Sequence, residues 1–63
     1  MIVNGKIAEF APMTLLEYLR HNKYNPAHVV VERNREIVTR ERFGKMKLEE
    51  DDEINILQFM GGG

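Results

Sequence analysis

The stretch MIVNGKIAEF, residues 1–10, decides how this chain begins to fold. At its centre stands Asn4-Gly5, the strongest short signal for a type I′ turn, because both central residues of that turn need positive φ angles. Apolar residues flank this pair on both sides, Met1 to Val3 before it and Ile7, Ala8 and Phe10 after it, as expected of two short strands around a turn. We therefore predict a β-hairpin with strands at residues 1–4 and 6–10.

The next segment, PMTLLEYLRHNKY (residues 12–24), predicts a helix. Thr14 and Glu17 have the spacing of a capping box, in which each residue satisfies a backbone N–H of the other. Pro26 prevents the helix from continuing. An apolar stripe at helical spacing is expected to face the core; its members are Leu15, Leu16 and Leu19.

The run HVVVERN, residues 28–34, predicts a strand inside the sheet, because three consecutive valines are apolar on both faces. Val29 and Val31 are expected to face the helix. Asn34-Arg35 is typical of a second turn, and a short strand is expected at residues 36–40. An irregular stretch follows, in which Phe43 is expected to pack into the core beneath a loop.

The last strand is expected in EINILQF, residues 53–59, after a return of the chain that begins near Leu48. Alternation places Ile54 and Ile56 inward and the apolar pair Leu57 and Phe59 on the opposite face. The predicted class is α+β, with the order ββαβ(β)β and one helix packed on a four- to five-stranded mixed sheet. A single helix covers one face only, so the other face is either polar or meets a partner.

Composition excludes several classes of function. The chain has nine basic and ten acidic residues and a net charge of −1, which argues against nucleic-acid binding. There is no cysteine, so disulfides and thiolate metal sites are ruled out. No stretch approaches the roughly 20 apolar residues that span a bilayer, and the N-terminus does not resemble a signal peptide. We expect a cytoplasmic protein that is monomeric when free, with one domain at residues 1–60 and a tail at 61–63.

No enzyme active site or metal site is expected. The two histidines, His21 and His28, stand alone in the sequence and are expected at a helix end and a strand start. The acidic run at residues 49–53 has no glycine and lacks the alternate spacing of calcium loops. We expect a solvated turn there, whose charge could attract a basic partner.

The tail residues Gly61, Gly62 and Gly63 carry the strongest functional signal. Without Cβ atoms, Gly61 and Gly62 could pass through a slot that is too narrow for other residues. An α-carboxylate on Gly63 would be ionised at neutral pH and could attack the α-phosphorus of a nucleotide. We expect Gly63 to carry the chemistry, and we expect a partner to dock on Leu57, Phe59 and Met60 with help from Glu50, Asp51 and Asp52.

Several motifs together resemble the ThiS family of sulfur carriers in thiamine biosynthesis. They are Val31-Glu32-Arg33-Asn34, the following EIV, the acidic turn, and EINILQFMGGG at the end. The resemblance implies a ubiquitin-like β-grasp fold with an extended tail, and a carrier that is a protein co-substrate rather than an enzyme. That family usually has glycine where this chain has Asp51, so a slightly strained turn is expected there.

The resemblance also implies a reaction sequence and its partners. An E1-like adenylyltransferase of the ThiF type would use ATP and Mg²⁺ to adenylate Gly63, and the carrier itself would bind no cofactor. A cysteine desulfurase would supply sulfur, and a thiazole synthase of the ThiG type would consume the resulting thiocarboxylate. The alternatives are a carrier for another pathway, such as a molybdopterin-type carrier, a ubiquitin-like protein modifier, and an interaction module with an inert tail.

Overall fold

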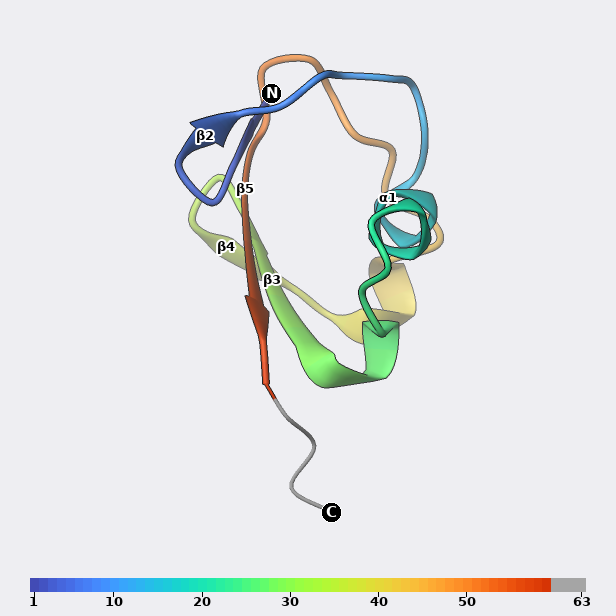
Figure 1. Ribbon diagram of the computed structural model, residues 1–63. Helices are drawn as coiled ribbons and strands as arrows, with labels where there is room; N and C mark the ends of the chain where they lie inside the picture. The colour runs from blue at the N-terminus through green and yellow to red at the C-terminus, as the bar shows by residue number, and fades with distance from the viewer. Residues whose placement is uncertain (60–63) are drawn as a thin grey trace.

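The computed structural model describes residues 1–59, and its elements follow the expected order. One helix lies against a five-stranded mixed sheet with the strand order β2-β1-β5-β3-β4 (Figure 1). The last strand, β5 (Glu53–Gln58), occupies the middle of this sheet. It runs parallel to β1 (Ile2–Val3) and antiparallel to β3 (Val29–Arg33). The predicted α+β architecture is confirmed.

The N-terminal hairpin forms as predicted, but its strands are shorter. β1 pairs with β2 (Lys6–Ile7) across Asn4-Gly5, whose φ angles of 52° and 80° are those of a type I′ turn. One further hydrogen bond runs from Ala8 N to Met1 O over 2.9 Å. Beyond it the chain leaves the sheet, since β1 offers only two residues for pairing, and Phe10 packs against the core instead.

The helix α1 (Leu15–His21) begins at the predicted capping box. Thr14 N donates to Glu17 Oε1 over 2.9 Å, and Glu17 N donates to Thr14 Oγ1 over 3.2 Å. Leu15 and Leu19 are fully buried, so the inward side of the helix is the apolar one. Local capping and the apolar stripe together explain why this short segment is helical.

The helix ends in a left-handed turn at Lys23, before the proline is reached. Lys23 has a φ of 62°; its N–H donates to Arg20 O over 3.1 Å, and Tyr24 N donates to Leu19 O over 2.9 Å. This pair of bonds defines a Schellman motif, in which glycine is the usual residue at the position of Lys23. The proline opens a separate 3₁₀-helix, η1 (Pro26–His28).

The third and fourth strands form the second hairpin. β3 pairs with β4 (Glu36–Val38) through Asn34 and Arg35, which have φ angles of 50° and 71°. β3 lies between β5 and β4, which confirms its predicted place inside the sheet. β4 is shorter than expected because the chain turns into a 3₁₀-helix, η2 (Arg40–Arg42).

The core lies between α1 and one face of the sheet (Figure 1). The inward positions predicted for β3 and β5 and the predicted core residue Phe43 are all buried, and Leu48 is buried as well. The buried apolar residues are Leu15, Leu19, Val29, Val31, Val38, Phe43, Met46, Leu48, Ile54 and Ile56. Because the helix covers only this face, the opposite face of the sheet stays open.

Candidate functional site

The side chain of Asp52 points into the fold from the acidic turn before β5, and this residue is only 3% exposed. Asp52 Oδ2 accepts a hydrogen bond from Glu49 N over 2.8 Å, and Oδ1 accepts one from Asn34 Nδ2 over 3.2 Å. Arg33 Nε lies 3.0 Å from Oδ1, but its N–H is not aligned for a hydrogen bond, so the contact is an ion pair. The expectation of a solvated turn is therefore wrong for Asp52, whose carboxylate is occupied within the fold and closed to a docking partner.

The surroundings of Asp52 favour its charged form. Burial would raise the pKa of this carboxyl group. The hydrogen bond from Glu49 N, together with Arg33 and Asn34, outweighs burial and holds the pKa of Asp52 below its ordinary value. Asp52 is thus a structural anion that joins the turn to the end of β3.

Glu50 and Asp51 are exposed, unlike Asp52. The turn is closed by a hydrogen bond from Asp52 N to Glu49 O over 3.1 Å. Asp51 is not among the residues with positive φ, so the strain expected from aspartate in place of glycine is absent. Of the three acidic residues expected to help docking, only Glu50 and Asp51 present their charge to solvent.

Two asparagine side chains hold β5 in place. Asn4 Oδ1 accepts a hydrogen bond from Ile56 N over 2.7 Å, and Asn34 Oδ1 accepts one from Glu53 N over 3.0 Å. Both asparagines occupy turn positions with positive φ. The sequence identified them as turn residues, but it did not reveal that their side chains also extend the hydrogen bonding of the central strand.

The end of β5 remains attached to the sheet as far as Phe59. Gln58 pairs with Val29, and Phe59 N donates one more hydrogen bond to His28 O over 3.0 Å. The rings of Phe59 and His28 are tilted by 45°, with centroids 6.1 Å apart. This contact fixes the point from which the chain continues toward its glycines.

The open face of the sheet carries the predicted apolar pair. Leu57 is 68% exposed and Phe59 is 45% exposed, as their alternation with the buried isoleucines predicted. Other exposed apolar side chains lie on the same open face, because their strand partners place them there; they are Ile2, Ile7, Val30 and Ile37. These four positions were not predicted from the sequence, although the inward assignment of Val29 and Val31 already implied that Val30 points outward.

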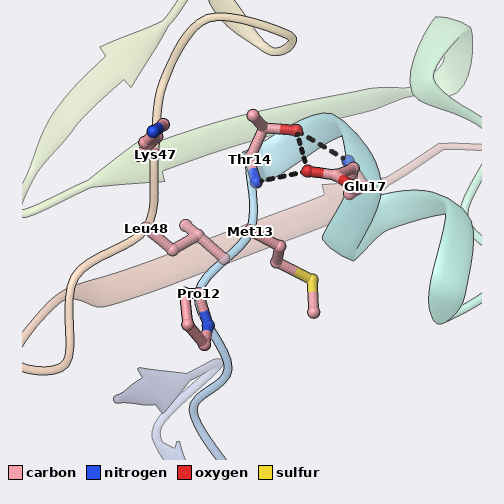
Figure 2. A pocket seen from close by; sticks show the side chains of 6 residues that line it. All are labelled: Pro12, Met13, Thr14, Glu17, Lys47 and Leu48. Atoms are coloured by element: carbon pink, nitrogen blue, oxygen red, sulfur yellow. Dashed lines mark hydrogen bonds between the residues drawn. The ribbon is translucent and has the colours of Figure 1, made fainter.

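A hollow lies beside the start of α1, and its lining residues are held by hydrogen bonds within the fold. Figure 2 shows its lining of Pro12, Met13, Thr14, Glu17, Lys47 and Leu48. The carboxylate of Glu17 is engaged by Thr14, and these hydrogen bonds hold the pKa of Glu17 below its ordinary value. The walls are tied together because Leu48 N donates to Met13 O over 2.9 Å.

Residues 1–59 hold no group of three or more side chains that could bind a metal ion. His28 is the last residue of η1, directly before β3 rather than in it, and its ring lies against Phe59; His21 is the last residue of α1, as expected. No helix in this part of the chain is both long enough and apolar enough to span a membrane. The expected docking residue Met60 and the expected tail, Gly61, Gly62 and Gly63, lie outside the described residues.

One helix on a mixed five-stranded sheet, with the last strand in the middle, defines a ubiquitin-like β-grasp protein. Among residues 1–59, exposed apolar side chains gather on the open sheet face, and Leu57 and Phe59 place two of them at the end of β5. A crystal structure of the thiamine biosynthesis protein ThiS from Geobacter metallireducens has this fold, with a TM-score of 0.78 and 35% identity over 98% of this chain and 96% of that one. A solution structure of a thiamine biosynthesis protein from the same organism gives a TM-score of 0.77 at 33% identity, over 98% of this chain and 85% of that one.

The sequence comparisons identify the family. The model of the ThiS family matches residues 1–63, and the chain belongs to that family. The sulfur carrier protein ThiS of Bacillus subtilis is 43% identical over 67 aligned positions, which cover 97% of this chain and 96% of that protein. A thiazole synthase of Magnetococcus marinus is 45% identical over 40 residues, which are 64% of this chain but only 12% of that much longer protein.

Proposed function

We propose that this protein is the sulfur carrier of thiamine biosynthesis and acts as a protein co-substrate rather than as an enzyme. The match of the ThiS family to residues 1–63, a range that includes the three glycines, is the observation that carries the proposal. The chain contains no cysteine, so it cannot hold sulfur as a side-chain persulfide. The carboxylate of Gly63 is the group that we propose to bear the sulfur.

The proposed chemistry has three steps at Gly63. A carboxylate oxygen attacks the α-phosphorus of ATP in an E1-like enzyme of the ThiF type, pyrophosphate leaves, and an acyl-adenylate forms. Mg²⁺ in that enzyme neutralises the phosphate charge. The outer sulfur of a cysteine desulfurase persulfide, delivered directly or through a persulfide on the activating enzyme, then displaces AMP and gives an acyl disulfide. A second thiol attacks the inner sulfur of that bond, forms a new disulfide there, and releases Gly63 as a thiocarboxylate. Gly61 and Gly62 would give the reacting group access to a narrow active site, because they add no side chain.

Thiazole synthase of the ThiG type is the proposed consumer of the thiocarboxylate. The support is the thiazole synthase of Magnetococcus marinus, which contains a 40-residue segment that is 45% identical to part of this chain. A fusion of a carrier with its acceptor enzyme in one polypeptide would contain a segment of this kind.

Docking of both enzymes is proposed on the open sheet face near the end of β5. Leu57 and Phe59 supply exposed apolar area there, and such patches mark interaction sites on small soluble domains. Met60 would extend this area. Glu50 and Asp51 would add negative charge that speeds association with a basic partner more than it strengthens binding.

Mass spectrometry of the intact protein tests the proposal. The chain is incubated with a ThiF-type enzyme, ATP, Mg²⁺, a cysteine desulfurase, cysteine and a thiol reductant that cleaves the acyl disulfide. We expect the replacement of one oxygen by one sulfur, and we expect EDTA to prevent it. Gly63→Ala should keep the fold and strongly reduce the product, since a Cβ would enter the narrow site. Gly44→Ala is the matched control, because its added Cβ would meet only Leu16 Cδ2 at 3.5 Å. Normal conversion of Gly63→Ala would contradict the proposed passage through a narrow slot, and conjugates of higher mass would indicate a protein modifier.

A further inference from the structure

A shallow hollow of about 350 Å³ lies on the open face of the sheet, between the first hairpin and the two central strands. It is lined by Asn4, Val30, Glu32, Asn55, Ile56 and Leu57. The strand pairing divides the hollow into two ends. Val30 lies opposite Leu57 and forms an apolar end, and Glu32 lies opposite Asn55 and forms a polar end.

The polar end is negatively charged, and no basic residue of the described strands lies on this face. Glu32 is partly buried and forms no salt bridge within residues 1–59. Glu53 lies diagonally across the ladder from Glu32, a placement that puts Cβ atoms roughly 7–8 Å apart. Among the described strand residues, Lys6 and Arg33 are the basic ones, and their pairing with Val3 and Ile54 turns them toward the helix side.

These two ends limit what can fill the hollow. An apolar side chain would remove water from the carboxylate of Glu32 without giving it a partner, which is costly. An acidic side chain would be repelled. Arginine and lysine have a long aliphatic stem that packs on apolar surface and a cationic head that pairs with carboxylates. A basic side chain thus suits both ends, with its stem on Val30 and Leu57 and its head at Glu32.

We infer that a basic side chain of the enzyme that activates Gly63 enters this hollow and pairs with Glu32. The inference rests on the proposed function and adds the chemistry by which the carrier is selected. Any enzyme that reaches the glycines must approach the end of β5, and Leu57 is both part of that end and a wall of the hollow. Glu32 is therefore a specificity-determining residue for docking and takes no part in the chemical step.

The test is a set of steady-state measurements of ATP–pyrophosphate exchange by a ThiF-type enzyme, with the carrier as the varied substrate. Glu32→Gln should raise KM about tenfold and leave kcat unchanged, because the ion pair forms on docking and not in the transition state. Glu36→Gln is the matched control. Glu36 is exposed on β4 and lies opposite Arg33 in the strand register, on the helix side of the sheet. Added salt should raise KM for the wild type and for Glu36→Gln, but less for Glu32→Gln. Unfolding curves of the three proteins should coincide.

The possible outcomes test the proposed function and the inference about Glu32 separately. If the wild type supports no exchange, both the proposed function and this inference are wrong. If the wild type is activated and Glu32→Gln has the KM of Glu36→Gln, the inference is overturned and the proposed function stands. A decrease in KM for Glu32→Leu would show that an apolar group fills the hollow and would also overturn it. The inference would also be overturned if Glu32→Gln affected only the transfer of sulfur to thiazole synthase.

Discussion

Arg33 and Asp52 form an ion pair at the end of the sheet, with Nε 3.0 Å from Oδ1. The pair links the last residue of β3 to the turn that leads into β5. Asp52 is nearly inaccessible to solvent, whereas Arg33 keeps part of its side chain in water. One buried carboxylate therefore ties the start of the central strand to the end of its neighbour β3.

Replacement of Asp52 by alanine should lower the free energy of unfolding by about 2–3 kcal/mol. The change would remove the acceptor for Glu49 N and leave Arg33 without its counter-ion. Urea unfolding followed by circular dichroism measures the loss. Glu50→Ala, two residues earlier on the exposed side of the same turn, should stay within about 0.5 kcal/mol of the wild type. Equal stability of the two variants would show that the Asp52 contacts contribute nothing.

The same carboxylate should make stability fall in acid. The pKa of Asp52 in the folded protein is lower than its ordinary value of 3.8, so the unfolded chain binds a proton more readily. Its contribution is complete above that ordinary value and is lost as the pH falls through the folded pKa. The difference in unfolding free energy between the wild type and Asp52→Asn should therefore shrink below about pH 3.8. Glu17 also has a lowered pKa, but it is present in both proteins and cancels. A difference that is constant with pH would contradict this assignment.

Asn4→Gly separates the two roles of Asn4. Glycine keeps the positive φ of the turn but removes the oxygen that accepts from Ile56 N. We expect the free energy of unfolding to fall by about 1 kcal/mol, the usual net contribution of a hydrogen bond. The amide of Ile56 should lose protection in hydrogen exchange more than the amide of Val31 in the same sheet. Unchanged protection of Ile56 would mean that the side-chain bond is not formed in solution.

Lys23→Gly should stabilise the protein. The φ of 62° at Lys23 is the left-handed conformation that glycine adopts without steric cost at the end of a helix. We expect a gain of about 0.5–1 kcal/mol in the free energy of unfolding. Arg20→Gly, inside the same helix, is the contrasting control and should cost about 1 kcal/mol. A loss of stability in both variants would show that Lys23 makes contacts worth more than its backbone strain.

The features that could be predicted from the sequence depend on neighbours along the chain. Asn4-Gly5 predicted the first turn, and Thr14 with Glu17 predicted the start of the helix, because turns and caps are set within four residues. Alternation alone placed Ile54 and Ile56 inward and Leu57 outward. The fold class followed from the order of these local elements and from the resemblance to the ThiS family.

The features that could not be predicted join distant residues. The hydrogen bond between Asn4 and Ile56 spans 52 positions, and the residues next to either one in the sequence do not predict it. In a run of consecutive acidic residues, no local signal marks Asp52 as the buried one, since its partners Arg33 and Asn34 come from another hairpin. The hollow at Glu32 likewise required the register of β3 against β5.

The central place of β5 has a consequence for how the chain folds while it is being translated. Within residues 1–59, β1 and β3 are not neighbours in the sheet and are joined through β5, which follows both of them in the chain. The sheet cannot close on a nascent chain that lacks it, because contacts between distant segments form only after the intervening loop is complete. Folding is thus deferred until β5 has been synthesised, and fragments cut short before β5 should fail to fold and be degraded.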